Sequence, residues 1–97
     1  MENRKYLIAY DISDARRRRQ VVKCLEDFGY RVQYSVFEMD GPESEKEKMM
    51  KRLLYFIDEE EDSLLVYEFD VPSWEKRKIY GKNKEMIEKY DDMYMIL

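Results

Sequence analysis

The feature that most constrains the fold is a repeated switch between strand-like and helix-like residue patterns over the first 70 residues. Residues 5–10 form a short apolar run of residues that favour strands, and the run stops at Asp11. Residues 15–28 then place apolar side chains at helical spacing, behind a Ser or Asp that can cap a helix. Gly29 follows at the position where a helix commonly ends in a left-handed residue. This first unit predicts a buried strand, a tight loop and an amphipathic helix.

A second unit of the same kind follows. Residues 31–40 are extended in character because apolar and polar side chains alternate, and they form either one long strand or two pieces joined by a kink. No two-residue hairpin signature divides them. Gly41-Pro42 is a turn signal, and residues 44–57 restore the helical spacing behind a Ser-x-x-Glu capping box. Residues 63–70 predict a further strand.

The order of these elements predicts the fold class. Helices interleaved with strands predict an α/β (α+β) sandwich, in which an antiparallel sheet has two helices on one face. The order β-α-β-β-α-β is the ferredoxin-like split unit. We also expect a C-terminal strand, either a short edge strand at residues 76–80 or an extended segment at residues 93–97.

The length of 97 residues fits one domain. We assign residues 1–81 to the ferredoxin-like domain and residues 82–97 to a C-terminal extension. Because the extension ends in apolar and tyrosine residues, which are seldom left in contact with water, we expect it to pack on a partner protomer.

The charge is unevenly distributed. The net charge of −4 argues, on its own, against nucleic acid as a partner. However, residues 1–37 carry eight Lys and Arg against five Asp and Glu, a net charge of +3, whereas residues 38–97 carry ten against seventeen, a net charge of −7. The basic excess is centred on residues 16–19, four consecutive arginines. A nucleic-acid site needs a local positive field rather than a positive total, so the first third of the chain is compatible with one.

Composition excludes several classes of protein. The single cysteine, Cys24, excludes an internal disulfide, and the absence of histidine excludes a zinc site or a Cys/His catalytic site. Cys24 lies on a helix face, so we expect a small core residue rather than a nucleophile. No apolar run approaches the roughly 20 residues of a membrane span, and no signal-peptide segment precedes the first strand. We therefore expect a cytoplasmic protein with no membrane partner.

Asp11 is the first candidate for chemistry. It ends an apolar strand, immediately before a loop that carries Ser13 and Asp14. A carboxylate in this position suits a hard ion such as Mg²⁺, which takes oxygen ligands and keeps several waters. From position alone, capping of the loop by Asp11 and of the helix by Asp14 is the stronger alternative. One carboxylate is also a poor metal site, whereas two copies brought together across a twofold axis would make a better one.

The four arginines at residues 16–19 lie on the opening turns of the first helix. A charge run usually marks a solvated face, but these arginines have no interleaved Glu for i,i+4 pairs, and the amino end of a helix disfavours cations. The arrangement therefore indicates a phosphate partner, with a solvent-exposed or protein-binding role as the alternative. Helical spacing spreads the four side chains around the helix, so that about two of them would reach one backbone.

Four aromatic residues near these groups are candidates for stacking on bases, as the aromatics of ferredoxin-like RNA-binding modules do. They are Tyr6, Tyr10, Tyr34 and Phe37. The signature of those modules, Lys/Arg-Gly-aromatic followed by further aromatics, is absent from the sequence. Burial in the core is therefore the alternative that the sequence favours for these four residues.

Several of these elements occur together at close spacing. They are Tyr10-Asp-Ile-Ser-Asp14, Arg17-Arg18, Leu25 before Gly29, and Arg31-Val-Gln-Tyr-Ser-Val-Phe-Glu38. In this combination the chain resembles the CRISPR-associated protein 2 family, and the Gln-x-Ser-Val-Phe-Glu element after a Gly-x-Arg turn is the most specific part. The resemblance covers residues 5–38 closely and continues more loosely through the second predicted helix and the strand at residues 62–70. Beyond Pro72 it rests on chain length and an Ile-Tyr-Gly element.

The resemblance implies a ferredoxin-like homodimer in which residues 31–40 are divided between two adjacent strands. It implies that Asp11 is the catalytic residue, and that Asp11 from both subunits holds a divalent metal, Mg²⁺, at the dimer interface. Arg17, Arg18 and Arg31 match family arginines that are expected to contact a nucleic-acid backbone. Further candidate site residues from the matching motifs are Tyr10, Asp14, Ser35 and Phe37.

The resemblance also implies an activity and partners. Members are metal-dependent endonucleases that act on RNA or double-stranded DNA, and they bridge two dimers of the CRISPR-associated protein 1 integrase during spacer acquisition in antiviral defence. We therefore expect a Mg²⁺-dependent phosphodiester hydrolase, because a chain without histidine would need a metal to activate water. A non-catalytic DNA-binding adaptor that bridges the integrase is the alternative. An RNA-binding domain unrelated to CRISPR is a third hypothesis.

Overall fold

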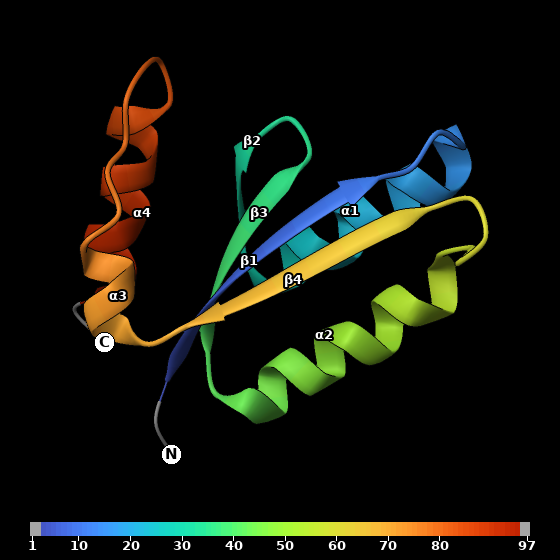
Figure 1. Ribbon diagram of the computed structural model, residues 1–97, viewed down its shortest axis with the longest axis horizontal. Coiled ribbons are helices and arrows are strands. Elements are labelled where there is room, and N and C mark those ends of the chain that lie inside the picture. Colours follow the sequence, from blue (N-terminus) through green and yellow to red (C-terminus); the bar gives the residue numbers. More distant parts are fainter. Residues whose placement is uncertain (1–2, 96–97) are drawn as a thin grey trace.

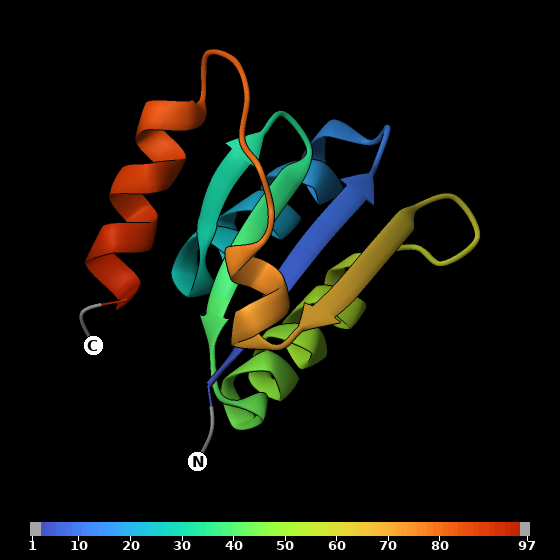
Figure 2. The ribbon, with the colours of Figure 1, turned by 60° about the vertical axis from the view of Figure 1, so that its left-hand side comes forward.

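The computed structural model describes residues 3–95, and the side chains of residues 3–91. The helices and strands are, in chain order, β1 (Arg4–Asp11), α1 (Ala15–Phe28), β2 (Tyr30–Gln33), β3 (Val36–Gly41), α2 (Glu43–Phe56), β4 (Ser63–Phe69), α3 (Val71–Glu75) and α4 (Lys84–Met95). The first six form the β-α-β-β-α-β order that the sequence predicts. Figure 2 shows α1 and α2 behind the sheet and α3 in front of it.

The four strands form one sheet in the order β2-β3-β1-β4, and every neighbouring pair is antiparallel. The central strand β1 pairs with β3 through Ile8 and Phe37, and with β4 through Ile8 and Val66. Strands that are distant in sequence therefore lie side by side around β1 (Figure 1). This is the ferredoxin-like arrangement, and the predicted fold class is confirmed.

The alternation of β1 decides which face of the sheet carries the core. Tyr6, Ile8 and Tyr10 point to the helix side and are at most 6% exposed. They pack with buried side chains of α1 and α2, namely Val21, Cys24, Leu25, Met49 and Leu53. Burial of each large aliphatic side chain stabilises the fold by about 1.5–3 kcal/mol. Cys24 is fully buried, as expected of a core residue.

The opposite face of the sheet is only partly covered. On this face β1 places Leu7 and Ala9, which are half-buried, and β4 places Leu65 and Tyr67 beside them. Leu65 is 51% exposed and Tyr67 is 52% exposed. We call the surface formed by these four residues the open sheet face. Exposed apolar side chains that lie together in this way are typical of a surface that contacts another molecule.

Residues 31–40 are divided between β2 and β3, as the resemblance implies, with Tyr34 and Ser35 as the turn. The turn contains neither Gly nor Asn, and no described non-glycine residue has a positive φ. It therefore lacks the residues that mark most two-residue hairpins. A register irregularity between Arg31 and Gln33 lies just before the turn.

The ends of the two long helices differ from expectation. Gly29 follows α1 with φ −155° and ψ −153°, an extended conformation rather than a left-handed one. Glycine is needed there for a different reason, because a Cβ would collide with the backbone carbonyl of Glu38 on β3. α2 begins at Glu43 with Pro42 as its N-cap and without a side-chain capping bond, so the predicted capping box is not formed.

The predicted C-terminal strand is wrong. Instead of an edge strand at residues 76–80, α3 starts directly after β4, with Asp70 Oδ1 accepting a hydrogen bond from the Ser73 backbone N–H at 2.8 Å. Residues 77–83 then pass across the sheet face rather than along an edge strand (Figure 2). A strand ladder needs an edge to pair with, which this path does not offer.

Residues 93–95, expected to be extended, belong to α4, and residues 96–97 of the expected segment lie outside the described residues. The helix forms because Ile87 and Tyr90, three residues apart, give the segment one apolar face. That face packs on β2 of the same chain, where Tyr90 stacks on Tyr30 with ring centroids 4.4 Å apart. The contact predicted between the extension and a partner protomer stays a prediction. Within residues 3–95, each helix is too short or too polar to cross a lipid bilayer.

Candidate site around Asp11

Asp11 is the last residue of β1, and its side chain is exposed. It pairs with Ser63 of β4, and the alternation of β1 places it on the side of Leu7 and Ala9. It borders a hollow of about 440 Å³, which we call the Asp11 hollow. The hollow is lined by Tyr10, Asp11, Ile12, Ser13, Arg18, Tyr34 and Ser35.

Asp14 and Arg18 fix the loop that follows Asp11. Asp14 Oδ2 accepts a hydrogen bond from the backbone N–H of Arg17 at 2.8 Å, so Asp14 caps α1. Arg18 Nη1 donates to the carbonyl oxygens of Ile12 at 3.0 Å and Ser13 at 3.3 Å. The guanidinium of Arg18 therefore lies across the loop, and its positive charge lies in the wall of the Asp11 hollow.

Tyr10 holds the β2–β3 turn against β1. Its backbone N–H donates to the carbonyl oxygen of Ser35 at 3.0 Å, and its hydroxyl donates to the carbonyl oxygen of Tyr34 at 3.2 Å. Tyr10 is only 6% exposed, so its ring is a core element rather than a surface for a base. Ser35 enters the hollow from the same turn. Tyr10 and Ser35 thus shape the wall of the hollow.

Arg17 does not line the Asp11 hollow and is paired with two carboxylates instead. Its Nε lies 2.9 Å from Asp62 Oδ2, and its Nη2 lies 3.1 Å from Glu61 Oε2. The hydrogen bond with Asp62 is the main reason why the pKa of Arg17 lies above its ordinary value. Adjacent arginines of α1 thus have different surroundings, since Arg17 is held by carboxylates and Arg18 by carbonyl oxygens.

Arg31 lies on β2, beside the arginines of α1, and its guanidinium carbon is 5.4 Å from the ring centroid of Phe37. Phe37 is 1% exposed and belongs to the core. It therefore supports Arg31 by a cation–π contact rather than presenting a ring to a base. Arg31 itself is exposed.

A second hollow, of about 580 Å³, lies between α1 and the β2–β3 turn. It is lined by Tyr10, Arg18, Arg19, Val22, Lys23, Glu26, Arg31 and Tyr34, and we call it the basic pocket. Four cations face one carboxylate there, a net charge of +3. Such a local excess attracts phosphate even on a chain of net negative charge.

Of the four cations in the basic pocket, Arg19 was expected only as part of the run at residues 16–19, and Lys23 was not expected at all. Their spacing of i,i+4 was the available signal, because it puts both side chains on one helix face. Tyr34 was named only as one of four aromatics, and it differs from the other three. It is 79% exposed, whereas Tyr6, Tyr10 and Phe37 are buried.

Metal binding at this site depends on how many carboxylates lie close to Asp11. The described part of the chain contains no group of three Asp, Glu, Cys or His side chains placed to hold one ion. One protomer therefore offers Asp11 alone, an exposed carboxylate beside loop oxygens. Mg²⁺ is commonly bound through one or two carboxylates while it keeps several waters. These residues fit such an ion if a second copy of Asp11 completes the ligand set.

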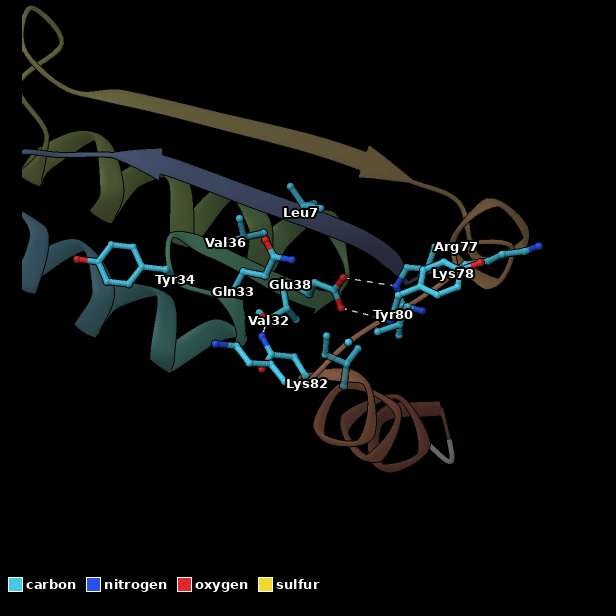
Figure 3. A pocket seen from close by; sticks show the side chains of 14 residues that line it. Leu7, Val32, Gln33, Tyr34, Val36, Glu38, Arg77, Lys78, Tyr80 and Lys82 are labelled. Carbon is cyan, nitrogen blue, oxygen red and sulfur yellow. Dashed lines mark hydrogen bonds and ion pairs between the residues drawn. The ribbon is translucent and has the colours of Figure 1, made fainter.

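A third hollow, larger than the other two, lies elsewhere. It has a volume of about 710 Å³ and lies between the sheet and residues 77–83. Figure 3 shows Glu38 and Arg77 facing each other at one end of it, and Nη2 of Arg77 lies 3.3 Å from Oε1 of Glu38. Tyr34 lines this hollow as well as the other two, but Asp11, Arg18 and Arg31 do not line it.

Comparison with known proteins identifies the family of the chain. The family model of CRISPR associated protein Cas2 matches residues 4–77. CRISPR-associated endoribonuclease Cas2 3 of Synechocystis sp. is 43% identical over 77 residues, which are 79% of this chain and 84% of that protein. Cas2 of Streptococcus pyogenes, a solved structure, has a TM-score of 0.70 and 32% identity, covering 79% of this chain and 99% of that one.

A chain in a solved partial Cas6-RT-Cas1–Cas2 complex is also similar, with a TM-score of 0.67 and 25% identity, covering 78% of this chain and 89% of that one. The match of residues 4–77 includes the whole β-α-β-β-α-β unit, and with it Asp11, Arg18, Arg31 and the basic pocket. The relatives thus share the part of the fold that forms the site, and the chain belongs to the CRISPR associated protein Cas2 family.

Proposed function

We propose that this protein is a CRISPR-associated endonuclease that cleaves a phosphodiester bond at Asp11, as a homodimer with Mg²⁺. The observation that carries the proposal is the placement of an exposed carboxylate, Asp11, in a hollow that Arg18 lines and that adjoins the basic pocket. RNA is the substrate that we favour, because the similar protein of Synechocystis sp. is named an endoribonuclease. Double-stranded DNA is the other substrate expected.

Asp11 would hold the ion with one carboxylate from each protomer. A bound divalent ion would supply the positive charge that activates water and neutralises the phosphate. The chain itself supplies the orientation, because Arg18 is tied to the carbonyl oxygens of Ile12 and Ser13. Both bonds come from Nη1 of Arg18, and a side chain that is already held in this way would lose little freedom when its other donors bind a phosphate.

The open sheet face supports the homodimer. Leu65 and Tyr67 leave about half of their surface exposed, next to the half-buried Leu7 and Ala9. Asp11 follows the same alternation of β1 and lies at the end of this face. A twofold axis would bury this face against its own copy, and an axis that runs along β1 would bring the two Asp11 side chains to the same end of the assembly.

The partner proposed besides nucleic acid is the Cas1 integrase. The support is the similarity to a chain in a solved complex whose name includes Cas1 and Cas2. In this role the protein would take part in spacer acquisition, and the arginines of α1 and β2 would contact a nucleic-acid backbone. The proposal gives Arg18 and Arg31 that task directly. For Arg17, contact with a phosphate requires release from Asp62.

The test is a nuclease assay with defined single-stranded RNA and duplex DNA, run with Mg²⁺ and with a chelator. We expect the chelator and Asp11→Asn each to reduce cleavage to background, while circular dichroism shows an unchanged fold. Glu60→Gln is the matched control, because Glu60 is an exposed carboxylate outside the Asp11 hollow, and it should cut at the parental rate. Cleavage by Asp11→Asn at the parental rate would refute the role of Asp11.

A second candidate function is a non-catalytic adaptor that binds DNA and bridges the integrase. It is favoured by the net charge of +3 in the basic pocket, which attracts a nucleic-acid backbone without any catalytic group. The two functions differ in a spacer-integration assay with the Cas1 partner. If the adaptor role suffices, Asp11→Asn supports integration and Arg18→Ala does not. If catalysis is required, both variants lose integration.

A further inference from the structure

The last turn of α2 carries large apolar side chains that are turned away from the core. Leu54 is 50% exposed and Tyr55 is 83% exposed, whereas Leu53 before them is fully buried. Successive residues of a helix are rotated by about 100°, so Tyr55, two residues after Leu53, lies roughly on the opposite side of α2. Its ring makes an edge contact with the ring of Phe56, with centroids 5.4 Å apart. An exposed aromatic side chain of this kind is typical of an anchor in a protein interface.

The loop that follows this turn is strongly negative. Residues 58–62 are five consecutive carboxylates, and Arg17 pairs with two of them, so a net charge of −4 remains. The carboxyl end of a helix is itself partly negative and favours cations, but α2 has no basic residue in its last turn. The cations before Tyr55, Lys51 and Arg52, lie one turn back, and Arg52 is paired with Asp27 at 2.9 Å. The arrangement therefore indicates a cationic partner.

We call Leu54, Tyr55 and the exposed Glu59 the α2 end. We infer that the α2 end docks into the basic pocket of a second copy of this chain, with Tyr55 as the side chain that enters the pocket. The two surfaces match in charge, because the pocket has a net charge of +3. Opposite charges around a buried aromatic anchor are typical of specific protein interfaces.

The basic pocket also suits an aromatic side chain. Tyr10, Val22 and Tyr34 give it an aromatic and apolar wall beside its cations. Its volume of about 580 Å³ is larger than one aromatic side chain occupies. Tyr55 can thus be covered on several sides while the carboxylates of its loop face the arginines and the lysine of the pocket.

The contact has to join two molecules. β2 and β4 are opposite edges of the sheet, the basic pocket includes Arg31 of β2, and α2 lies on the side of β4 (Figure 1). One chain therefore does not place its own α2 end in its own pocket. Because the two surfaces differ, each copy can dock on one neighbour and receive another, which builds a ring or a filament. The open sheet face lies on the other side of the sheet from α1 and α2, so the proposed homodimer remains possible.

Docking occupies the cations of the basic pocket. While Tyr55 and the carboxylates of a neighbour fill the pocket, another anion binds there only by displacing them. Self-association thus competes with every other use of the pocket, including the contact with a nucleic-acid backbone proposed above. The inference itself requires neither cleavage nor a metal.

Sedimentation velocity of the full chain at several protein concentrations tests the inference. At about 0.1 M salt we expect assemblies of more than two chains that grow with concentration, and at about 1 M salt, where charges are screened within about 3 Å, these should be lost. The homodimer proposed through the apolar open sheet face should persist at the higher salt. We expect Tyr55→Ala to lower the association constant of the larger assemblies by about 30-fold or more, the effect of losing an interface anchor.

Charge reversal identifies the two surfaces. Glu59→Lys on the α2 end and Lys23→Glu in the basic pocket should each abolish the larger assemblies at about 0.1 M salt. A mixture of the two variants should form them again, because one variant supplies an intact pocket and the other an intact α2 end. The inference is overturned if the parent forms no assembly of more than two chains, if Tyr55→Ala assembles like the parent, or if the mixture does not assemble.

Three matched controls lie outside both surfaces. Tyr80→Ala removes a tyrosine that is 82% exposed between α3 and α4. Glu75→Lys and Lys76→Glu make the same changes of charge at exposed positions at the end of α3. All three should assemble like the parent. Loss of the larger assemblies in the controls as well would show a response to net charge or to any surface tyrosine, and it would also overturn the inference.

Discussion

The side chains of Arg17 and Asp62 form an ion pair across 45 residues of sequence, with Arg17 Nε 2.9 Å from Asp62 Oδ2. The Asp62 carboxylate is fully buried, and its Oδ2 also accepts a hydrogen bond from the Asp58 backbone N–H at 2.8 Å. The pair joins the first turn of α1 to the loop that leads into β4. Because β4 lies next to β1, the pair also steadies the end of the sheet where Asp11 lies.

The contribution of the Arg17–Asp62 ion pair to the stability of the fold depends on pH. The hydrogen bonds from Arg17 and from the Asp58 backbone favour the charged carboxylate, so the pKa of Asp62 lies below its ordinary value. Such a group stabilises the folded state above the unfolded carboxyl pKa of about 3.9, and its contribution is lost as the pH falls through the lower folded value. We expect Asp62→Asn to lower Tm at neutral pH and to flatten the decline of Tm below about pH 4.

Thermal unfolding of the two proteins, followed by circular dichroism from neutral to acid pH, checks this expectation. Glu60→Gln, an exposed carboxylate of the same loop, is the matched control and should follow the parental curve. If Tm falls in parallel with pH for Asp62→Asn and the parent, the Arg17–Asp62 ion pair is not the cause of the loss of stability in acid.

Because Arg17 is held by Asp62, we expect Arg17 and Arg18 to contribute differently to nucleic-acid binding. Removing a phosphate-contacting arginine lowers the slope of log K against log salt by about 0.9 on duplex DNA, and we expect this change for Arg18→Ala. Arg17→Ala should change the slope less, because Arg17 must leave Asp62 before it can reach a phosphate. Anisotropy titrations at several salt concentrations measure both slopes. Equal changes in the two variants would mean that nucleic acid displaces the carboxylates from Arg17.

Local patterns in the sequence were sufficient for the β1–α1 unit and for β4. The alternation of β1 and the helical spacing of α1 are short-range signals that the core preserves, as the buried Ile8 and Cys24 illustrate. The cap formed by Asp14 is equally local, and it was among the alternatives that the sequence favoured.

The remaining features depend on contacts that no local pattern encodes. The turn at Tyr34 and Ser35 has no glycine, so the hairpin is visible only through its pairing. The basic pocket is assembled from α1 and the β2–β3 turn, and its membership follows from the packing of the two. α4 was misread because Ile87 and Tyr90 find their apolar partners on β2, more than 50 residues earlier in the chain.

Gly29 provides a test of close packing between α1 and β3. A Cβ at this position would lie against the backbone carbonyl of Glu38, which cannot move without shifting β3. We expect Gly29→Ala to destabilise the protein by about 2 kcal/mol or more, the usual range for overpacking. Gly41→Ala is the matched control, because a Cβ there would meet only side chains at 3.5 Å and 3.7 Å, ordinary contact distances. Urea unfolding that gives equal losses for both variants would contradict the clash.

The open sheet face provides a test of the homodimer. Leu65 lies on this face and is 51% exposed, whereas Leu54 lies on α2 and is 50% exposed. We expect Leu65→Asp to shift the protein from dimer to monomer, because a buried, unpaired carboxylate at the interface costs several kcal/mol. Leu54→Asp should remain a dimer. Sedimentation velocity at several protein concentrations distinguishes the outcomes, and a dimer that survives Leu65→Asp would exclude this face.

Arg77 is the centre of a charge network that fixes the C-terminal segment. Its Nη2 lies 2.8 Å from both carboxylate oxygens of Asp91 on α4 and 3.3 Å from Oε1 of Glu38 on β3. Its guanidinium carbon also lies 4.5 Å from the ring centroid of Trp74. Burial lowers the pKa of Arg77, but its hydrogen bonds to Glu38 and Asp91 outweigh this effect, so the pKa lies above its ordinary value. Arg77 therefore keeps its positive charge at all pH values near neutrality.

We expect Arg77→Met to destabilise the protein by about 3 kcal/mol, because it leaves the buried carboxylate of Glu38 without its cation. A loss of this size lowers Tm by roughly 12–24 °C in a domain of this length. Adding Glu38→Gln should recover part of the loss, since the buried charge is then removed. Lys78→Met, at the exposed neighbouring position, is the matched control and should have little effect.

Hydrogen exchange then locates the effect. If the network anchors α4 to its own chain, the amides of residues 84–95 lose protection in Arg77→Met while those of β1 keep theirs, and the parental protection is independent of protein concentration. If the extension instead packs on a partner protomer, protection of α4 rises with protein concentration, because the contact then follows dimer formation. The same measurement thus tests both the network and the predicted partner contact of the extension, since only the partner contact makes the protection of α4 depend on protein concentration.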